Sequence, residues 1–503
     1  MKVTVNGKEK TLKEGATLKD AIQGETYVEG STISIYLSTE KVTEVTNDFC
    51  IETSRGEMVL HLYDTPEAKL FRQLASSVTG SNVRWSNKSL VAFGSFPTGI
   101  TSSPEAGQYR RYDCFFSLGG NDNQTTYLMI AKSNFTKAYG AGTGKIGKIT
   151  VGRHLLDIVK EGESIVDIRP VVSETSQDNV IITKDLSQPL EEGYAINTSV
   201  LFKLRHDSPS SAEHVLIVTS RGYMNISEGT GTFAGCRDDL DTDVSPEYHG
   251  VRDVGEVMVR NSGTGTGHIL VYKERRQISP ELNTAGSVVR GMPLLARAKA
   301  GDIVAVETDP PRILSVGMTQ KAGEAFLAKW GVKQVRTGDT SDAAIIVDQG
   351  PEATMEALRT GQVETFGVPK DQIYRISITT DDEPTAYYFK KVTGLNHKPI
   401  GQLKTQFSFP GSPMVTFYGD EARAQNLYPQ EPFKKCKKGE IGVTNQSRPH
   451  HGLVGIRLID SKQYGPTGEE PYGTNLVGKF LGDLAEMETL DDEQIIYITE
   501  AKL

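Results

Sequence analysis

A glycine-rich run near residue 140 has the residue types of a phosphate-binding loop. Residues 140–145 read Gly-Ala-Gly-Thr-Gly-Lys, and such a loop holds phosphate oxygens with backbone N–H groups and a lysine. Tyr139 stands where the first glycine of that motif is needed, and Ile146 stands where a serine or threonine would bind Mg²⁺. We therefore interpret the run as a glycine-rich turn.

Two other patterns have residues that could hold a metal ion. Aspartates at 239, 241 and 243 match the start of a calcium-binding loop, but Val244 replaces its glycine and Gly250 replaces its bidentate glutamate. His450 and His451 are adjacent, so on a strand they would point in opposite directions, and no third ligand is spaced nearby. We expect an acidic surface turn and no metal centre of the protein's own.

The cysteines are few and widely separated. None belongs to a C-x-x-C pair, whereas a self-contained zinc or iron–sulfur site usually uses closely spaced thiolates. We interpret them as reduced thiols, mostly buried in strands; the alternative is that one thiolate is donated to a cluster shared with another protein. The four residues are Cys50, Cys114, Cys236 and Cys436.

Composition excludes several classes of protein. The 503 residues carry a net charge of −9, and the longest basic run, at 434–438, is followed at once by Gly439 and Glu440, so nucleic acid is not an expected partner. Runs of 18 apolar residues are absent, and the N-terminus has no signal pattern. We expect a cytoplasmic protein that does not enter the membrane.

One sequence pattern occurs three times along the chain. Each copy begins with a proline that opens a helical segment and continues to a short apolar run that ends in a polar turn. The distance from proline to apolar run is the same in the first two copies and longer in the third. The prolines are Pro66, Pro209 and Pro384, and the runs begin at Cys114, Val257 and Ile441. A repeat of this length predicts repeated domains, because solenoid units span only about 20–50 residues.

The first 48 residues predict a separate small module. Val3-Thr-Val5 alternates, Asn6-Gly7 is a hairpin turn, and Thr17 caps a short helix that ends near Gly24. Alternating runs at 33–37 and 42–45 complete a strand–strand–helix–strand order. This opening resembles that of ubiquitin-like β-grasp sulfur carriers. Those carriers act through a free C-terminal Gly-Gly, which the continuing chain excludes here, so we interpret the module as a docking domain.

The repeated unit resembles a cyclophilin. A hairpin from Cys50 to Leu62 precedes the helix that starts at Pro66, and residues 90–99 align without gaps on the family's F-M-I-Q-G-G-D-P-T-G segment. Residues 123–130 match its N-G-S-Q-F-F-I segment, and 148–159 match its last strand and helix. The resemblance implies three β-barrel domains.

The catalytic groups of cyclophilins do not carry over. By the resemblance, an arginine donates a hydrogen bond to the prolyl nitrogen and a glutamine helps to hold the peptide. In the first copy Trp85 falls at the arginine position and Arg84 lies one residue out of register, while Phe93 and Tyr127 fall on glutamines. We therefore expect no catalytic site in this copy.

A different segment, residues 312–368, separates the second and third copies. It alternates strand and helix patterns: a helical stretch ends at Gly331, 343–347 is a strand, and a helix begins at Pro351. The predicted fold is therefore mainly β, of the α+β multidomain kind. Its expected domains are a β-grasp module (1–48), cyclophilin-like copies 1 (49–172), 2 (173–311) and 3 (369–503), and a small inserted α/β domain (312–368).

The whole chain resembles the archaeal family called methanogenesis marker protein 3. The residues that carry this resemblance include the opening 3–7, the repeated copies, the insert, and the stretches at 439–458 and 464–478. It implies an accessory subunit of the machinery that activates methyl-coenzyme M reductase. It also implies that the partners are the reductase, its activating proteins and other methanogenesis marker proteins. Iron–sulfur clusters, ATP and the nickel tetrapyrrole would be held by partner subunits, and this chain would hold no cofactor.

Two functions of different class remain open. In the first, the degenerate copies form a non-catalytic scaffold, with Tyr387, Tyr388, Tyr464 and Tyr472 of copy 3 as interface candidates, since aromatic residues supply large contact area. In the second, the chain is a divergent prolyl isomerase or chaperone.

Overall fold

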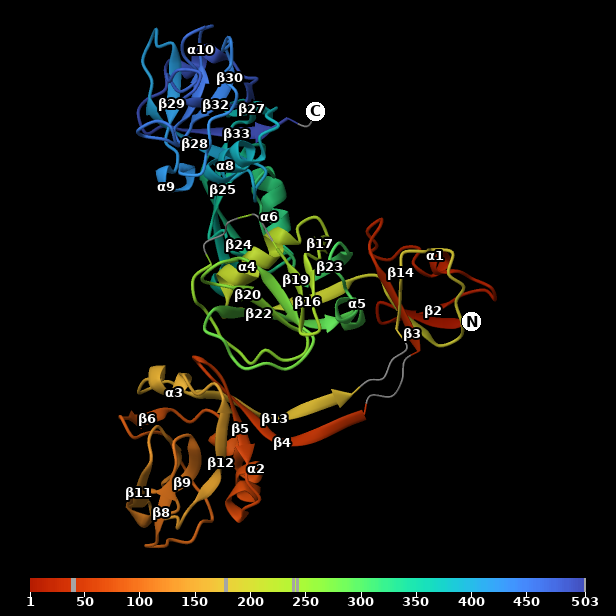
Figure 1. Ribbon diagram of the computed structural model, residues 1–503, viewed down its shortest axis with the longest axis vertical. Helices are drawn as coiled ribbons and strands as arrows, with labels where there is room; N and C mark the ends of the chain where they lie inside the picture. Colours follow the sequence, from red (N-terminus) through yellow and green to blue (C-terminus); the bar gives the residue numbers. More distant parts are fainter. Residues whose placement is uncertain (38–41, 176–179, 238–239, 241–243, 502–503) are drawn as a thin grey trace. The chain divides into compact units, whose positions relative to one another are not determined.

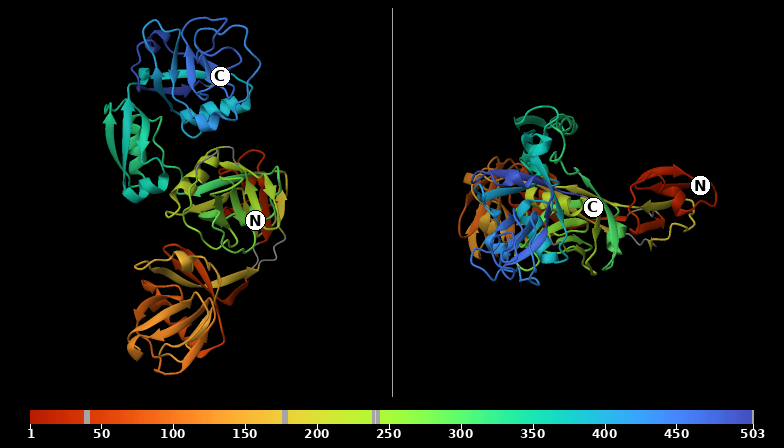
Figure 2. Two further views of the ribbon diagram at one scale, coloured as in Figure 1. Left: turned by 60° about the vertical axis from the view of Figure 1, so that its left-hand side comes forward. Right: turned by 90° about the horizontal axis from the view of Figure 1, so that it is seen from above.

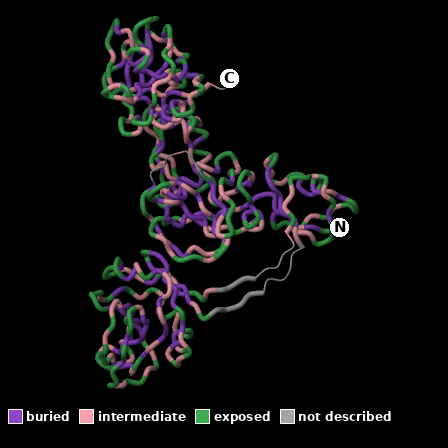
Figure 3. The backbone as a smooth tube through the Cα atoms, in the orientation of Figure 1, coloured by how far each residue is buried: buried purple, intermediate pink, exposed green. Residues whose placement is uncertain are grey.

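The computed structural model describes residues 1–37, 42–175, 180–237, 240 and 244–501. These residues form two compact units, Met1–Pro311 and Arg312–Leu503, and each is considered by itself. Buried residues collect in the interior of each folded part, and exposed residues lie on its outside (Figure 3). No helix of the described residues is long and apolar enough to cross a membrane.

The first sheet of unit 1 is discontinuous in sequence. Its order is β14-β3-β15-β1-β2, and β1 is parallel to β15 while the other neighbours are antiparallel. Helix α1 (Leu18–Ala21) covers it through Leu18. The strands are β1 (Lys2–Val5), β2 (Lys8–Thr11), β3 (Ile33–Leu37), β14 (Ile181–Thr183) and β15 (Tyr194–Asn197).

The expected boundary at residue 48 therefore differs from the structure. Two of the five strands follow copy 1 in the chain, so copy 1 is inserted into this sheet. Residues 42–45, expected to complete the N-terminal module, belong instead to β4 (Val42–Thr53), which pairs with β13 (Ile165–Thr175) over most of its length (Figure 1). A local sequence pattern reveals a strand, but it does not reveal which distant strand pairs with it.

Copy 1 is an eight-stranded curled sheet of order β13-β4-β5-β12-β9-β10-β7-β6. Helix α2 (Pro66–Val78) starts where Thr65 accepts a hydrogen bond from the Ala68 N–H, and it buries Phe71 in the core. A short helix α3 (Leu155–Ile158) precedes β13, and a separate ribbon pairs β8 with β11. The remaining strands are β5 (Gly56–Leu62), β6 (Val83–Ser86), β7 (Leu90–Phe96), β8 (Ala106–Tyr109), β9 (Asp113–Leu118), β10 (Thr126–Ala131), β11 (Phe135–Ala138) and β12 (Lys145–Val151), with a 3₁₀ turn η1 (Gly119–Asn121).

Copy 2 has the order β17-β23-β16-β22-β20-β21-β19-β18. Its sheet begins at Val200 rather than near the expected boundary at 173, because 181–197 belongs to the first sheet. Helices α4 (Pro209–Val218) and α5 (Met292–Ala296) pack on it. The strands are β16 (Val200–Leu204), β17 (Tyr223–Asn225), β18 (Glu228–Gly229), β19 (Phe233–Cys236), β20 (Glu256–Arg260), β21 (Ile269–Tyr272), β22 (Leu282–Arg290) and β23 (Ile303–Asp309).

Unit 2 contains the insert and copy 3. The insert has a three-stranded sheet, β24-β26-β25, with two helices and a 3₁₀ turn. Val316, Ile346 and Val368 of the insert pack with Ile400 of copy 3 in one apolar cluster. The elements are α6 (Gln320–Ala328), β24 (Lys333–Gly338), β25 (Ile345–Gly350), α7 (Thr354–Thr360), β26 (Gln362–Val368) and η2 (Lys370–Gln372).

Copy 3 is a closed barrel of order β27-β32-β30-β31-β29-β28-β33, drawn in cyan to blue in Figure 2. Helix α8 (Glu383–Thr393) begins after Asp382, which accepts a hydrogen bond from the Thr385 N–H, and it ends at left-handed Gly394. The other elements are β27 (Ile373–Ile378), β28 (Gly401–Phe407), β29 (Met414–Phe417), α9 (Glu421–Ala424), β30 (Glu440–Thr444), β31 (Val454–Arg457), β32 (Thr474–Phe480), α10 (Leu484–Met487) and β33 (Ile495–Glu500).

The repeat seen in the sequence is a structural repeat. Helices α2, α4 and α8 each follow a strand that pairs antiparallel with the strand before a later short helix (α3, α5 or α10) of its domain. The pairs are β5 with β12, β16 with β22, and β27 with β32. The helices that carry Phe71 and Phe389 take equivalent positions in copies 1 and 3, and both rings are fully buried. Copy 1 differs by an extra strand, β4, whereas in copies 2 and 3 the last strand pairs parallel with the first.

Candidate functional site

The degenerate catalytic positions of copy 1 do not form one polar site. Trp85 and Tyr127 contact each other edge to face, with ring centroids 4.9 Å apart. Phe93 lies on the other side of the sheet, fully buried in the barrel core. The pairing of β6 with β7 shifts register between Val83 and Trp85, which makes Arg84 the extra residue of a bulge, and its side chain is exposed.

The outer face beside Trp85 is filled by aromatic rings of copy 1 itself. The β8–β11 ribbon places Tyr109 there, 2% exposed and stacked on Phe115 with centroids 3.9 Å apart. Phe135 and Tyr139 pack on the same rings. This packing occupies the surface on which an arginine and a glutamine would have to meet a peptide.

The glycine-rich run 140–145 borders a cleft of about 430 Å³. Its walls come from the start of α2, from residues 100–105 and from residues 141–143. Gly142 and Gly144 have left-handed backbones (φ 60° and 56°), as a glycine turn requires. The lining includes Glu67 and Glu105 but no lysine or arginine, so the charge does not suit phosphate.

In copy 3 the outer face of β30 and β31 is also covered by its own chain. A Cβ on Gly455 of β31 would lie 2.2 Å from the carbonyl oxygen of Pro466, so the loop 459–473 rests directly on the sheet. Arg457, 4% exposed, lies beneath this loop and donates hydrogen bonds to the carbonyls of Ile459 (2.9 Å) and Gly465 (3.4 Å). Burial lowers the pKa of Arg457.

The four tyrosines predicted as interface candidates have different environments. Tyr388 is 3% exposed; its hydroxyl donates to the Gly452 carbonyl (2.7 Å) and accepts from the Asp420 N–H (2.8 Å), and burial raises its pKa to about 12. Tyr388 therefore does not suit an interface, because α8 buries the face that carries Thr385, Tyr388 and Phe389. Tyr387 is half-buried. Only Tyr464 (47%) and Tyr472 (56%) of these four are exposed.

All four cysteines are buried, and none of them forms a disulfide bond. Burial raises the pKa of Cys50, Cys114 and Cys436 well above the ordinary thiol value. A raised pKa disfavours the thiolate that a metal cluster would need.

In the part of the chain that the structure describes, no group of three or more His, Cys, Asp or Glu side chains could hold a metal ion. The aspartates 239, 241 and 243 lie outside the described residues. His450 and His451 lie in a turn rather than on a strand, and His450 has a left-handed backbone (φ 58°).

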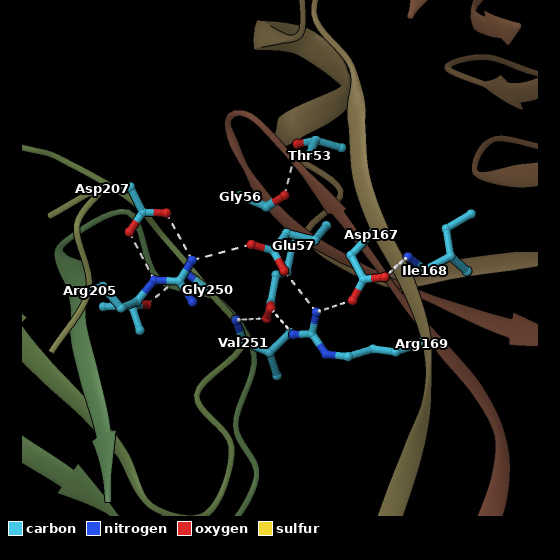
Figure 4. Close-up of polar contacts among 12 residues, drawn as sticks. Thr53, Gly56, Glu57, Asp167, Ile168, Arg169, Arg205, Asp207, Gly250 and Val251 are labelled. Atoms are coloured by element: carbon cyan, nitrogen blue, oxygen red, sulfur yellow. Dashed lines mark hydrogen bonds and ion pairs between the residues drawn. The ribbon is translucent and has the colours of Figure 1, made fainter. Parts of the chain in front are cut away.

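A charged cluster joins copies 1 and 2 (Figure 4). Glu57 of β5 pairs with Arg169 and accepts a hydrogen bond from the Val251 N–H at 3.1 Å. Glu52 of β4 accepts from Arg169 (2.8 Å) and from Arg205 of copy 2 (3.2 Å). These contacts fix the two copies in unit 1 to each other.

Two further side chains complete this junction. The guanidinium of Arg205 lies 4.0 Å from the ring centre of Tyr248. Burial, together with the nearby charge of Glu57, raises the pKa of Glu256 to about 8. Sequence reasoning missed the cluster, since its members are single charged residues spread over two copies.

Unit 2 has a charged node of its own. Glu352 of the insert pairs with His397 (3.0 Å) and Lys398 (3.3 Å) of copy 3. Burial alone would raise the pKa of Glu352, but hydrogen bonds from these two partners lower it to about 2.

Fold and sites define a mainly β, multidomain protein with several curled sheets and one closed seven-stranded barrel. A family model described as "Putative peptidyl-prolyl cis-trans isomerase domain" matches residues 374–501, which is copy 3. Among solved structures, the chain is similar to a cyclophilin type peptidyl-prolyl cis-trans isomerase of Cryptosporidium parvum. The identity is 16% and the TM-score 0.19, over 25% of this chain and 97% of that one; so low a score carries no argument here.

Relatives match the chain over its full length. The UPF0288 protein of Methanothermobacter thermautotrophicus is 34% identical over 100% of this chain and 98% of its own. The UPF0288 protein of Methanopyrus kandleri is 33% identical, with 100% and 99% covered, and that of Methanosarcina mazei is 30% identical, with 99% and 96% covered. The chain belongs to the UPF0288 protein family of methanogenic archaea.

Proposed function

We propose that this protein is a non-catalytic accessory or scaffold subunit of a methanogenesis-linked complex, the ATP-dependent activation machinery of methyl-coenzyme M reductase. The full-length relatives come from methanogens, and the sequence resembles methanogenesis marker protein 3. The partners would be the reductase, its activating proteins and other marker proteins, and the complex would act in the cytoplasm.

One observation supports a binding role over catalysis: the outer face of copy 1 is filled by its own aromatic rings. Prolyl isomerisation needs a donor that reaches the prolyl nitrogen in the transition state. Trp85 and Tyr127 occupy the positions that the cyclophilin resemblance assigns to the arginine and to a glutamine, and their rings contact each other. Phe93 packs in the core. A domain without that donor still folds, and its surface and sheet edges remain available to bind a partner.

Strand order supports the proposed domain identities. The first sheet, β2-β1-β15-β3-β14 with β1 parallel to β15, has the order of a β-grasp fold interrupted by copy 1. The shared strand neighbours and proline-initiated helices of copies 1, 2 and 3 suit three cyclophilin-like domains. In this proposal ATP, iron–sulfur clusters and the nickel tetrapyrrole belong to partner subunits.

The second candidate is a peptidyl-prolyl isomerase or chaperone, which the family model over residues 374–501 favours. The bulge residue Arg84 is the one exposed arginine among the four degenerate positions of copy 1. An isomerase that used it would lose activity in Arg84→Ala.

Affinity purification of the full chain from the methanogen that makes it, followed by mass spectrometry, tests the scaffold role. We expect the reductase and its activating proteins to co-elute in fixed ratio, and to dissociate as salt is raised, because the chain is acidic. Recovery of the chain alone under low salt would contradict the proposal.

A further inference from the structure

Copy 3 exposes a group of large apolar side chains at one end of β28. Phe407 is 48% exposed and Phe409 is 47% exposed, although their rings contact each other edge to face at 5.3 Å. Tyr418 (46%) and Ile495 (43%) are exposed on the chain segments that flank β28, both of them next to Lys404. We name these four residues the aromatic patch. Contiguous exposed apolar groups of this kind mark interaction sites more often than scattered single ones.

Local backbone geometry places Phe407 outside the barrel. Along β28, Leu403 and Thr405 face the core and Lys404 faces outward, as strand alternation requires. The pairing with β29 shifts register between Thr405 and Phe407, so Phe407 is turned outward where alternation would have buried it. The exposure of Phe407 is therefore set by the pairing of β28 with β29 and not by a loop conformation.

An acidic segment borders the aromatic patch. Residues 483–493 hold six carboxylates and no lysine or arginine: Asp483, Glu486, Glu488, Asp491, Asp492 and Glu493. Helix α10 buries Met487 against the barrel, and Leu490 is buried after it, which directs the charged side chains outward. Asp491 and Asp492 are exposed and have no ion-pair partner among the described residues.

Hydrogen bonds hold the acidic segment against the patch. The Ser408 hydroxyl, between the two phenylalanines, donates to the Met487 carbonyl at 2.9 Å. The Glu493 N–H donates to the Thr405 carbonyl at 2.9 Å. Glu493 pairs with Lys404, whose ammonium lies 5.5 Å from the ring centre of Tyr418. The nearby lysine is thus neutralised within the domain, and the field at the patch is that of the remaining carboxylates.

We propose that the aromatic patch and residues 483–493 form a docking surface for a segment of a partner protein in which large apolar side chains alternate with lysine or arginine. Aromatic residues anchor such contacts because they bury large area with few rotors to immobilise. The carboxylates select a basic partner and speed its encounter. The inference rests on the proposed scaffold function and names one of its docking sites and the chemistry of what docks there.

Fluorescence anisotropy of labelled peptides on the full chain tests this surface. A short peptide of alternating leucine and lysine should bind at about 150 mM salt. A serine–lysine peptide should bind about tenfold more weakly, and a leucine–glutamate peptide should not bind. Equal binding of the leucine–lysine and serine–lysine peptides would show charge attraction without a docking site and would overturn the proposal.

Paired variants locate the binding. Phe407→Ser with Phe409→Ser should weaken the leucine–lysine peptide about tenfold, and Asp491→Asn with Asp492→Asn about threefold, with a flatter salt dependence. The controls are Tyr428→Ser with Ile459→Ser, at large side chains of the same domain that are 68% and 54% exposed, and Asp381→Asn with Glu431→Gln. Both control pairs should stay within about twofold of the parent. Equal loss in patch and control variants overturns the assignment.

Three further outcomes decide which occupant binds and which of the two proposals fails. If the parent chain sediments as a dimer and Phe407→Ser with Phe409→Ser makes it a monomer, a second copy occupies the surface and the proposed partner is wrong. If that double variant still retains its native partners as the parent does, this docking site is wrong while the scaffold role stands. A parent chain that retains none refutes the scaffold role whatever the peptides do.

Discussion

Copies 1 and 3 share their strand neighbours but differ in what their interiors contain. In copy 3, Asn445 donates to Asn475 (2.9 Å), and Asn475 donates to the Thr385 hydroxyl and the Tyr428 carbonyl. Copy 2 repeats this network with Asn261, Asn283 and Ser211. At the matching places copy 1 has Leu118 and Gly144. Strand order is thus retained while core chemistry diverges.

Copies 1 and 3 also differ in the contacts that hold their loops in place. The amide pair ties the loop before β30 to the start of α8, since Gln430 N–H also donates to Asn475. Copy 1 instead packs apolar Leu118 in its core and fills its outer face with rings. One domain is held by buried hydrogen bonds and the other by aromatic packing, which predicts different responses to substitution.

The largest effect is expected from Asn475→Ala. It removes four hydrogen bonds in a buried site, at about 1 kcal/mol each, so copy 3 should lose about 4 kcal/mol. Native-state hydrogen exchange at β32 amides of the full chain measures this. Asn426→Ala, at an exposed asparagine of the same domain, should change it by less than about 0.5 kcal/mol. A small effect in Asn475→Ala would mean that the network does not distinguish the copies.

Phe93→Gln gives the next largest effect. It restores the glutamine that the cyclophilin resemblance expects but places an amide in the core of copy 1, so we expect a loss of about 3 kcal/mol. The same exchange measurement at β7 and β10 reports it, and Phe93→Leu should lose less than about 1.5 kcal/mol. If Phe93→Gln is tolerated, Phe93 is not the core residue that the comparison makes it.

The proline helices and the repeated order of copies could be predicted from sequence, because a helix start and strand alternation are local patterns. The first sheet could not, since β14 and β15 follow a whole inserted domain. Nor could the site be assembled: Trp85 and Tyr127 meet while Phe93 faces the core, and the pairings shift register at Arg84 and just before Tyr127. The exposure of Phe407 depends on a similar register shift in β28.

The charged contacts of the two units should differ in how their contribution to stability depends on pH. The pKa of Glu352 in the folded state, about 2, lies below its ordinary value of 4.5. Its pairing with His397 and Lys398 therefore stabilises unit 2 above pH 4.5, and this stabilisation is lost as the pH falls toward 2. Glu352→Gln should lower the Tm by about 2–4 °C at pH 7, with a smaller difference at pH 3. Calorimetry that finds the same difference at both pH values contradicts this.

The junction of copies 1 and 2 should respond to pH in the opposite direction. The pKa of Glu256, about 8, lies above its ordinary value of 4.5, so ionisation is disfavoured in the folded state. Stability should then fall as the pH rises from 4.5 to 8. Glu256→Gln should flatten this part of the Tm profile, while Glu161→Gln, at an exposed residue, should not. A parent profile that is already flat from pH 5 to 8 refutes the assignment.

A protease-coupled prolyl isomerisation assay on the full chain tests the absence of catalysis most directly. Because no donor is in place beside Trp85 and Tyr127, and because the chain itself covers the outer face of copy 1 and that of β30 and β31 in copy 3, we predict the uncatalysed rate at every protein concentration. Acceleration that rises with concentration and disappears in Arg84→Ala would contradict the account and restore the isomerase.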